Sequence, residues 1–293
     1  MKNTFHVTKM LGEAFAVLAA ILWAGSMVVA AKTLRDVGPV RANAFKTLFS
    51  VATMLPIAFL MGEFQNLFYL DFYGSLYVII AAIIGFGVGD TLLFRSIGLI
   101  GVSRSYTIGY SYPFFAIALA TVFLGEPFLL RYTFGAVIIF FGIVNIFLER
   151  NVAFDKSNTK GFIIAFAAAI SWSIGTTLVA LGLRTINIIQ ANTIRFPLLF
   201  IFLFIFSILR PSESRLNKEN LSLLLLSGIL GMIIGGIVFL FSIQLIGVAR
   251  AAPLSSSSPL WAAIMSSLYL KEKITWRVIM SSIMVAVGTY FLF

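Results

Sequence analysis

The sequence predicts an all-α integral membrane protein in which ten transmembrane helices form two inverted five-helix repeats. Hydrophobic residues make up 60% of the chain and charged residues only 11%, and the mean hydropathy is +1.03. An ordinary soluble domain is about half apolar and about a quarter charged. The apolar residues form ten long runs, and the motifs of the first five runs recur in order in the last five.

Each predicted span is a run of about 18 to 25 mostly apolar residues between charged or turn-rich breaks. The spans are expected near residues 12–34, 43–62, 73–98, 103–124, 131–149, 161–183, 191–209, 220–246, 250–270 and 275–293. In a chain this apolar, basic loops at the lipid headgroups explain the net charge of +10 better than nucleic acid does. The lipid bilayer is the expected partner, and nucleic acid is not.

A polar break divides these spans five and five. Residues 150–160 read RNVAFDKSNTK, so we expect a first repeat over residues 1–149, a linker over 150–160 and a second repeat over 161–293. Because five is an odd number, the two repeats must enter the membrane in opposite orientations. Such an inverted repeat is typical of transporters that alternate access.

The clearest repeat is a stretch that carries a proline. Its two copies are GVSRSYTIGYSYPFFAIALATVFLGE at 101–126 and GVARAAPLSSSSPLWAAIMSSLYLKE at 247–272. Each copy is predicted to be one membrane-crossing helix with Pro113 or Pro259 inside it, where proline bends a helix and is a candidate hinge. The closing glutamates, Glu126 and Glu272, are interpreted as charges that stabilise the following turns.

Other matched residues lie earlier in each half. At a constant spacing of 149 residues the pairs are Trp23 with Trp172, Asn43 with Asn192, and Lys46 with Arg195. The tryptophan in the first span, the basic residue early in the second, the mid-helix proline and a terminal Leu-x-Glu together resemble the EamA-like branch of the drug/metabolite transporter superfamily. The resemblance covers essentially the whole chain. It implies a ten-helix exporter or exchanger of amino acids or other small metabolites, with its site between the halves.

Asp90 is an acidic residue in the middle of the third predicted span, where an ionised carboxylate is costly. Its counterpart in the second repeat is Gly236. One interpretation is a proton-coupling or cation-binding group. The other is a buried carboxylate that Lys32, Lys46 or Arg95 neutralises for packing.

Lys46 and Arg195 each lie about one helical turn inside a span, with Asn43 and Asn192 three residues earlier on the same face. Their matched positions favour substrate binding, through an anionic group such as a carboxylate, or a pair of gates. The alternative is that the long side chains extend back to the membrane interface.

Aromatic and hydroxyl side chains are the remaining candidates for a substrate pocket. Tyr106 and Tyr110 share one predicted helix face with Pro113, and Ser256 belongs to a run of four serines at 255–258. Hydroxyl groups in lipid need partners, so these serines are expected against a cavity or another helix. Trp23 and Trp172 either cover the pocket or pack between helices.

The leading functional prediction is a secondary transporter of small metabolites in the plasma membrane, as a monomer or homodimer, with Asp90 as the candidate for proton coupling. A flippase for a lipid-linked anion is the alternative. An intramembrane enzyme is disfavoured because Asp90 has no second mid-span acid or histidine beside it. With no cysteine and one histidine, neither a metal nor another cofactor is expected.

Overall fold

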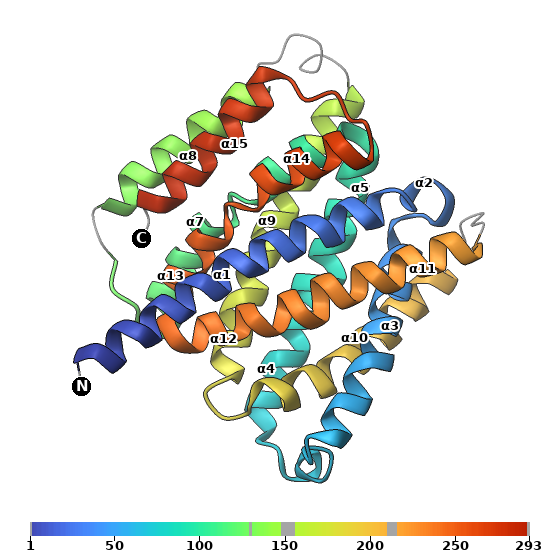
Figure 1. Cartoon of the computed structure of the whole chain (residues 1–293), viewed down its shortest axis with the longest axis vertical. Coiled ribbons are helices and arrows are strands. Elements are labelled where there is room, and N and C mark those ends of the chain that lie inside the picture. The colour runs from blue at the N-terminus through green and yellow to red at the C-terminus, as the bar shows by residue number, and fades with distance from the viewer. Residues whose placement is uncertain (1, 129–130, 148–155, 210–215, 292–293) are drawn as a thin grey trace.

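The computed structural model describes residues 2–128, 131–147, 156–209 and 216–291, which form helices and no strands (Figure 1). Among these residues, seven helical segments are long and apolar enough to cross a membrane, and Trp276–Gly288 is a shorter apolar helix. About 20 apolar residues suffice for a span. The predicted all-α membrane fold is therefore confirmed.

The helices of the first repeat run from the N-terminus to the predicted linker. In order, they are α1 (Lys2–Ala31), α2 (Leu34–Val37), α3 (Pro39–Leu60), the short 3₁₀ helix η1 (Gln65–Tyr69), α4 (Phe72–Ala82), the π-helical η2 (Ile83–Asp90), α5 (Thr91–Ile100), α6 (Val102–Gly109), α7 (Tyr112–Leu119), the π-helical η3 (Ala120–Leu124) and α8 (Arg131–Phe147).

The second repeat follows the same order. Its helices are α9 (Lys156–Gly182), α10 (Ile188–Leu209), α11 (Lys218–Ser227), the π-helical η4 (Gly228–Gly235), α12 (Gly236–Ile246), α13 (Val248–Ser255), α14 (Ser258–Tyr269) and α15 (Trp276–Phe291). The predicted linker, residues 150–160, lies partly outside the described residues. From Lys156 onward it is helical, because α9 begins there.

The two repeats pack through equivalent pairs of helices. Helix α3 packs against α10, and α8 packs against α15; Figure 1 shows these pairs at opposite ends of the molecule. Helix α1 contacts α12 and α14, while its counterpart α9 contacts α5 and α7. Each first helix thus lies against the third and fourth spans of the other repeat, so the centre of the molecule is built from both repeats.

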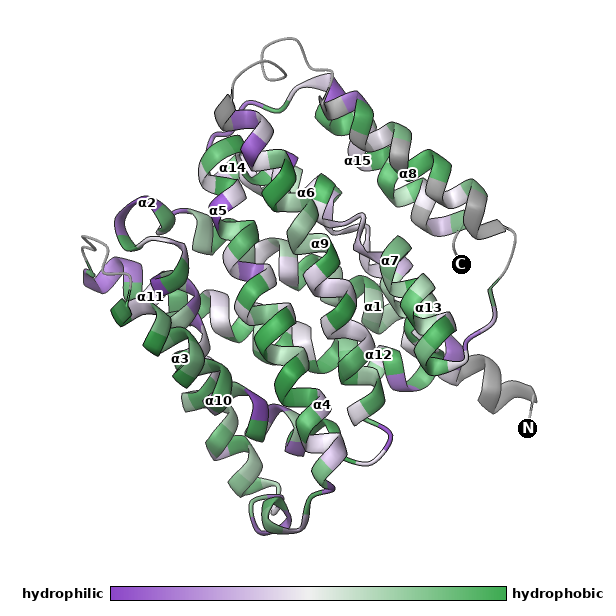
Figure 2. Cartoon of the chain, turned by 180° about the vertical axis from the view of Figure 1, so that it is seen from behind, coloured by the Kyte–Doolittle hydropathy of each residue, from purple (hydrophilic) through white to green (hydrophobic). Residues whose placement is uncertain are grey.

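The outer helices present apolar side chains to their surroundings. On α10, Phe204, Ile205 and Ile208 are each about half exposed. Figure 2 shows hydrophobic colours along α4 and α10, while hydrophilic residues gather at α2 and at the start of α11. An exposed apolar surface of this kind is suited to lipid.

The fourth span of each repeat is interrupted by a two-residue turn, so each proline begins a new helix rather than lying inside an unbroken one. In the first repeat, Val102–Leu124 is still one segment long enough to cross a membrane. Helix α6 ends at Gly109 and α7 begins at Tyr112, with Pro113 in its first turn. Likewise α13 ends at Ser255 and α14 begins at Ser258, with Pro259 in its first turn. Proline lacks an N–H but fits the first turn of a helix, where that N–H has no partner.

The closing glutamates reach across to the other repeat. Glu272 accepts hydrogen bonds from the backbone N–H groups of Val102 (2.8 Å) and Ser103 (3.2 Å) and from the Ser103 hydroxyl (2.7 Å). Glu126 accepts from the N–H groups of Val248 (3.1 Å) and Ala249 (2.9 Å). The first N–H groups of a helix have no partner within it. The glutamates therefore cap α6 and α13 and tie the repeats together, rather than stabilising only the turns beside them.

Candidate functional site

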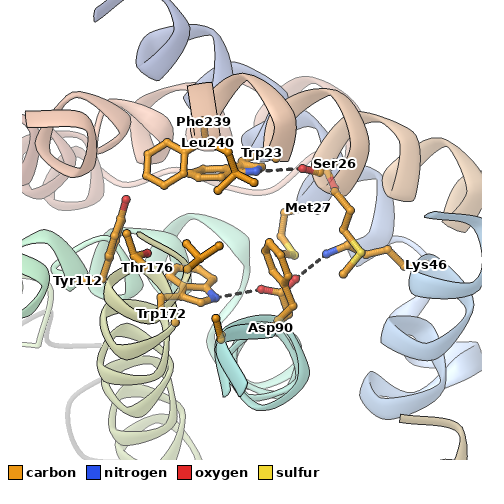
Figure 3. A pocket seen from close by; sticks show the side chains of 18 of the residues that line it. Trp23, Ser26, Met27, Lys46, Asp90, Tyr112, Trp172, Thr176, Phe239 and Leu240 are labelled. Carbon is orange, nitrogen blue, oxygen red and sulfur yellow. Dashed lines mark hydrogen bonds and ion pairs between the residues drawn. The ribbon is translucent and has the colours of Figure 1, made fainter. Parts of the chain in front are cut away.

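A pocket lies between the two repeats, with a cavity volume of about 90 Å³, where about 10–15 Å³ is enough for one water molecule. The side chains around it come from spans one to four of the first repeat and spans one to three of the second. They are Trp23, Ser26, Met27, Lys46, Ala81, Gly85, Phe86, Asp90, Tyr106, Tyr110, Tyr112, Trp172, Gly175, Thr176, Val179, Arg195, Gly231, Met232, Gly236, Phe239 and Leu240. Most of this lining is shown in Figure 3.

Aromatic rings form a large part of the wall. Tyr106 and Tyr110 stack with their ring centres 5.1 Å apart, and Trp172 meets Tyr110 edge-on at 5.6 Å. Tyr112 lies beyond the break in the fourth span, 6.1 Å from Trp172. On the opposite side, Trp23 packs against Phe239 at 4.6 Å. We call these six residues the aromatic box: Trp23, Tyr106, Tyr110, Tyr112, Trp172 and Phe239.

Hydrogen bonds to neighbouring helices fix several of these rings. The Tyr106 hydroxyl donates to the backbone carbonyl of Trp23 (2.9 Å), and Trp23 Nε1 donates to the carbonyl of Gly231 (3.0 Å). The Tyr112 hydroxyl lies 2.7 Å from Ser255 Oγ. Buried aromatic side chains with a polar end usually find such partners. The walls of the box are therefore held in place by contacts within the first repeat and between the repeats.

Asp90, at the end of η2, is the acidic residue of the pocket. Its Oδ2 lies 2.6 Å from Lys46 Nζ, and its Oδ1 accepts a hydrogen bond from Trp172 Nε1 at 2.9 Å. Figure 3 shows the carboxylate between these two groups, which come from α3 and α9. Of the partners considered for Asp90 from the sequence, Lys46 is therefore the one it contacts.

Arg195 lines the pocket from α10 and is 2% exposed. Its guanidinium lies over the rings of Phe86 (5.3 Å) and Phe196 (5.1 Å). The other basic candidate, Lys46, is 3% exposed. Both basic side chains are thus buried and face the pocket, so the alternative in which they extend to the membrane interface is wrong.

The structure brings together seven of the candidate residues taken from the sequence. Those that line the pocket are Trp23, Lys46, Asp90, Tyr106, Tyr110, Trp172 and Arg195. The remaining candidates lie outside its lining; they are Asn43, Asn192, Ser256 and the two hinge prolines Pro113 and Pro259. Asn43 donates instead to the carbonyl of Phe86 (2.7 Å) and to Thr91 Oγ1 (3.0 Å), and Ser256 Oγ lies 3.5 Å from the carbonyl of Tyr110.

Several lining residues were not among the candidates. Tyr112 was missed because the prediction of a continuous helix places it off the face shared by Tyr106 and Tyr110. Met27 and Thr176 were also missed, although they occupy equivalent positions at the spacing of 149 residues. That repeat spacing is the signal that finds them.

Acidic and metal-binding side chains are sparse in the described part of the chain. Those residues contain no group of three or more His, Cys, Asp or Glu side chains that could hold a metal ion.

Comparison with known proteins gives a consistent family. The model of the EamA-like transporter family matches residues 10–148 and 159–293. An uncharacterized transporter of Archaeoglobus fulgidus is 27% identical over 270 residues, covering 92% of this chain and 93% of that protein. The uncharacterized transporter YoaV of Bacillus subtilis is 22% identical over 274 residues, covering 92% of each. One solved crystal structure, 14% identical, aligns with a TM-score of 0.73 over 96% of this chain and 95% of that one, a likeness of fold alone.

Proposed function

Because the chain belongs to the EamA-like transporter family, we propose that it is a secondary transporter in the cell membrane. Its substrates are small metabolites that carry an ammonium group, amino acids and related compounds among them. They bind in the pocket between the repeats. Transport proceeds by alternating access, in which the two repeats rock around a central site.

The aromatic box carries this proposal. The faces of tryptophan and tyrosine rings attract cations, and the attraction grows when the cation is removed from water. Seven aromatic side chains line the pocket. Phe86 is one, and the other six form the box, four from the first repeat and Trp172 and Phe239 from the second. A small cation surrounded in this way contacts both repeats at once, which is what a site for alternating access requires.

Asp90 lies beside the rings as one half of a buried ion pair. Its two oxygens contact Lys46 and Trp172. Protonation of Asp90 would weaken both contacts and leave Lys46 as an unpaired charge. We therefore propose that Asp90 couples proton movement to the movement of substrate.

Polar contacts between the repeats lie at both ends of α3, where a rocking motion would break them in turn. At its C-terminal end, Glu63 accepts hydrogen bonds from Asn187 and Gln190 of the second repeat and from Asn66 of its own repeat, each at 3.0 Å. The bond from Asn66 is the largest cause that lowers the pKa of Glu63. Near the start of α3, Lys32 pairs with Glu219 at 2.7 Å, and this hydrogen bond raises the pKa of Lys32. Both groups are thus held in their charged forms.

The alternative of a flippase receives less support from the site. In that alternative Lys46 and Arg195 would contact the anionic headgroup of a lipid-linked substrate, whereas Lys46 is already paired with Asp90. Membership in a family of transporters also favours transport over the enzyme considered from the sequence.

Thermal unfolding of the detergent-purified protein with a panel of ligands tests the proposal. The panel contains amino acids, primary amines, quaternary ammonium compounds, organic anions and lipid phosphates. A ligand at about 100 times its dissociation constant adds about 2.7 kcal/mol of stability. Tyr73, on α4, is 67% exposed and lies outside the pocket lining. Ammonium compounds are expected to raise the unfolding temperature in the parent and in the surface variant Tyr73→Leu, but not in the pocket variant Tyr110→Leu. A rise with lipid phosphates or organic anions alone would contradict the proposal.

A further inference from the structure

Arg195 is a buried cation without a hydrogen-bond partner at two of its nitrogens. Both Nε and Nη2 are buried and unpaired among the described residues. The aromatic rings of Phe86 and Phe196 lie beside the guanidinium. A ring face does not provide the oxygen acceptors with which a carboxylate binds a guanidinium. An arginine stays charged in proteins, and a buried charge is costly unless it is paired. Some group is therefore expected to complete this site.

The first repeat has a partner for the equivalent cation. Lys46 occupies the position equivalent to Arg195 and is paired with Asp90. The residue equivalent to Asp90, at a spacing of 146 residues, is Gly236. The second repeat therefore has the cation of the pair but not the carboxylate.

Asn192, three residues before Arg195, also lacks the side-chain partner that its equivalent has in the first repeat. Asn43 donates to the hydroxyl of Thr91, whereas its equivalent Asn192 is fully buried with neither side-chain polar atom paired. The residue equivalent to Thr91 is Ile237. One helical turn of α10 thus carries two polar side chains, and for each of them the second repeat lacks the polar side chain that serves as partner in the first.

Resting on the proposed function, we infer that the substrate itself supplies the missing carboxylate. Its carboxylate binds the Arg195 guanidinium beside Gly236, while its ammonium group lies in the aromatic box. The transported class is then zwitterionic. A guanidinium pairs with a carboxylate through two parallel hydrogen bonds, which favours a carboxylate over a single-atom anion.

Space at Gly236 supports this assignment and makes it testable. Gly236 lines the pocket, and a Cβ added there would meet only the carbonyl of Gly231, at an ordinary contact distance of 3.7 Å. A side chain can therefore begin at this position without a clash at its Cβ. An aspartate there would restore in the second repeat the carboxylate that Asp90 provides in the first.

The experiment compares ligands that differ in the carboxylate alone. The probes are L-leucine with L-leucinamide, and trimethylglycine with tetramethylammonium, measured by calorimetric titration of the purified full chain. In at least one pair the zwitterion should bind about tenfold or more tightly than its partner, as expected for hydrogen bonds to a charged group. Arg195→Gln should abolish this preference. Equal binding within the pairs would overturn the inference and leave the proposed function intact, whereas no binding of any probe would count against both.

Gly236→Asp is the second variant, with Gly236→Asn as its matched uncharged control. Asp at 236 should take the place of the substrate carboxylate, so the preference for zwitterions should disappear in Gly236→Asp and persist in Gly236→Asn. Without ligand, Gly236→Asp should unfold at a higher temperature than Gly236→Asn. A lower unfolding temperature would overturn the inference that Arg195 lacks a carboxylate. The inference would also be overturned if chloride alone stabilised the protein and Arg195→Gln removed that effect. The group that pairs with Arg195 would then be an inorganic anion rather than the substrate carboxylate.

Discussion

Lys46 Nζ lies 2.6 Å from Asp90 Oδ2 inside the pocket, with the two side chains 3% and 6% exposed. Both charges have left water, and each compensates the other. Removal of one partner from a buried pair leaves an uncompensated charge, whereas replacement of both often costs little. The pair therefore gives distinct expectations for single and double substitutions.

Asp90→Asn alone should destabilise the protein by about 3–5 kcal/mol, because Lys46 is left without its carboxylate. The double variant Asp90→Asn with Lys46→Met should recover most of this loss. Reversible unfolding in denaturing detergent measures both values as a double-mutant cycle. If Asp90→Asn alone is as stable as the parent, the pair does not hold this part of the pocket.

The double variant also tests proton coupling. Asparagine cannot titrate, so transport by Asp90→Asn with Lys46→Met should lose its dependence on a pH gradient. Substrate exchange without a gradient should continue. The measurement is uptake into proteoliposomes with and without an imposed gradient. An unchanged response to the gradient would assign coupling to another group.

The two tryptophans should differ in their roles despite their equivalent positions. Trp172 Nε1 donates to the Asp90 carboxylate, whereas Trp23 Nε1 donates to a backbone carbonyl. A hydrogen bond to a charged group contributes about 1.5–3 kcal/mol and a neutral one about 0.5–1.5 kcal/mol. Trp172→Phe should therefore be more destabilising than Trp23→Phe. The free energies of unfolding of the two variants, measured under the same conditions, test this expectation. A larger loss in Trp23→Phe than in Trp172→Phe would contradict it.

The span boundaries and the repeat could be predicted because both depend on local sequence. Hydropathy places the spans, and constant spacings pair Trp23 with Trp172 and Lys46 with Arg195. The same spacing identifies Gly236 as the equivalent of Asp90. These relations need no knowledge of how helices pack.

Contacts between distant segments could not be predicted in this way. The place of Tyr112 depends on the break between α6 and α7, which the helical period does not reveal. The sequence likewise offered three basic partners for Asp90, and packing of α3 against the third span selects Lys46. Glu126 and Glu272 were assigned to their own turns because nothing local indicates that they reach the other repeat.

The glutamate caps should differ in strength. Glu272 accepts three hydrogen bonds and Glu126 accepts two, because Ser103 adds a hydroxyl where Ala249 has none. Loss of a helix cap costs about 0.5–2 kcal/mol. Glu272→Ala should therefore lower the free energy of unfolding more than Glu126→Ala does. When Ser103→Ala is already present, the losses caused by the two glutamate substitutions should be more nearly equal. Unfolding curves of these variants measure this, and equal losses from both glutamates in the parent chain would contradict it.

Counterflow in proteoliposomes tests most directly whether substrate crosses the membrane through the aromatic box. Liposomes are loaded with an unlabelled ligand from the binding screen, and entry of the same labelled ligand is followed. The parent and Tyr73→Leu should accumulate label, while Tyr110→Leu, reconstituted in equal amount, should not. Equal accumulation by all three proteins would show that transport does not pass through this pocket.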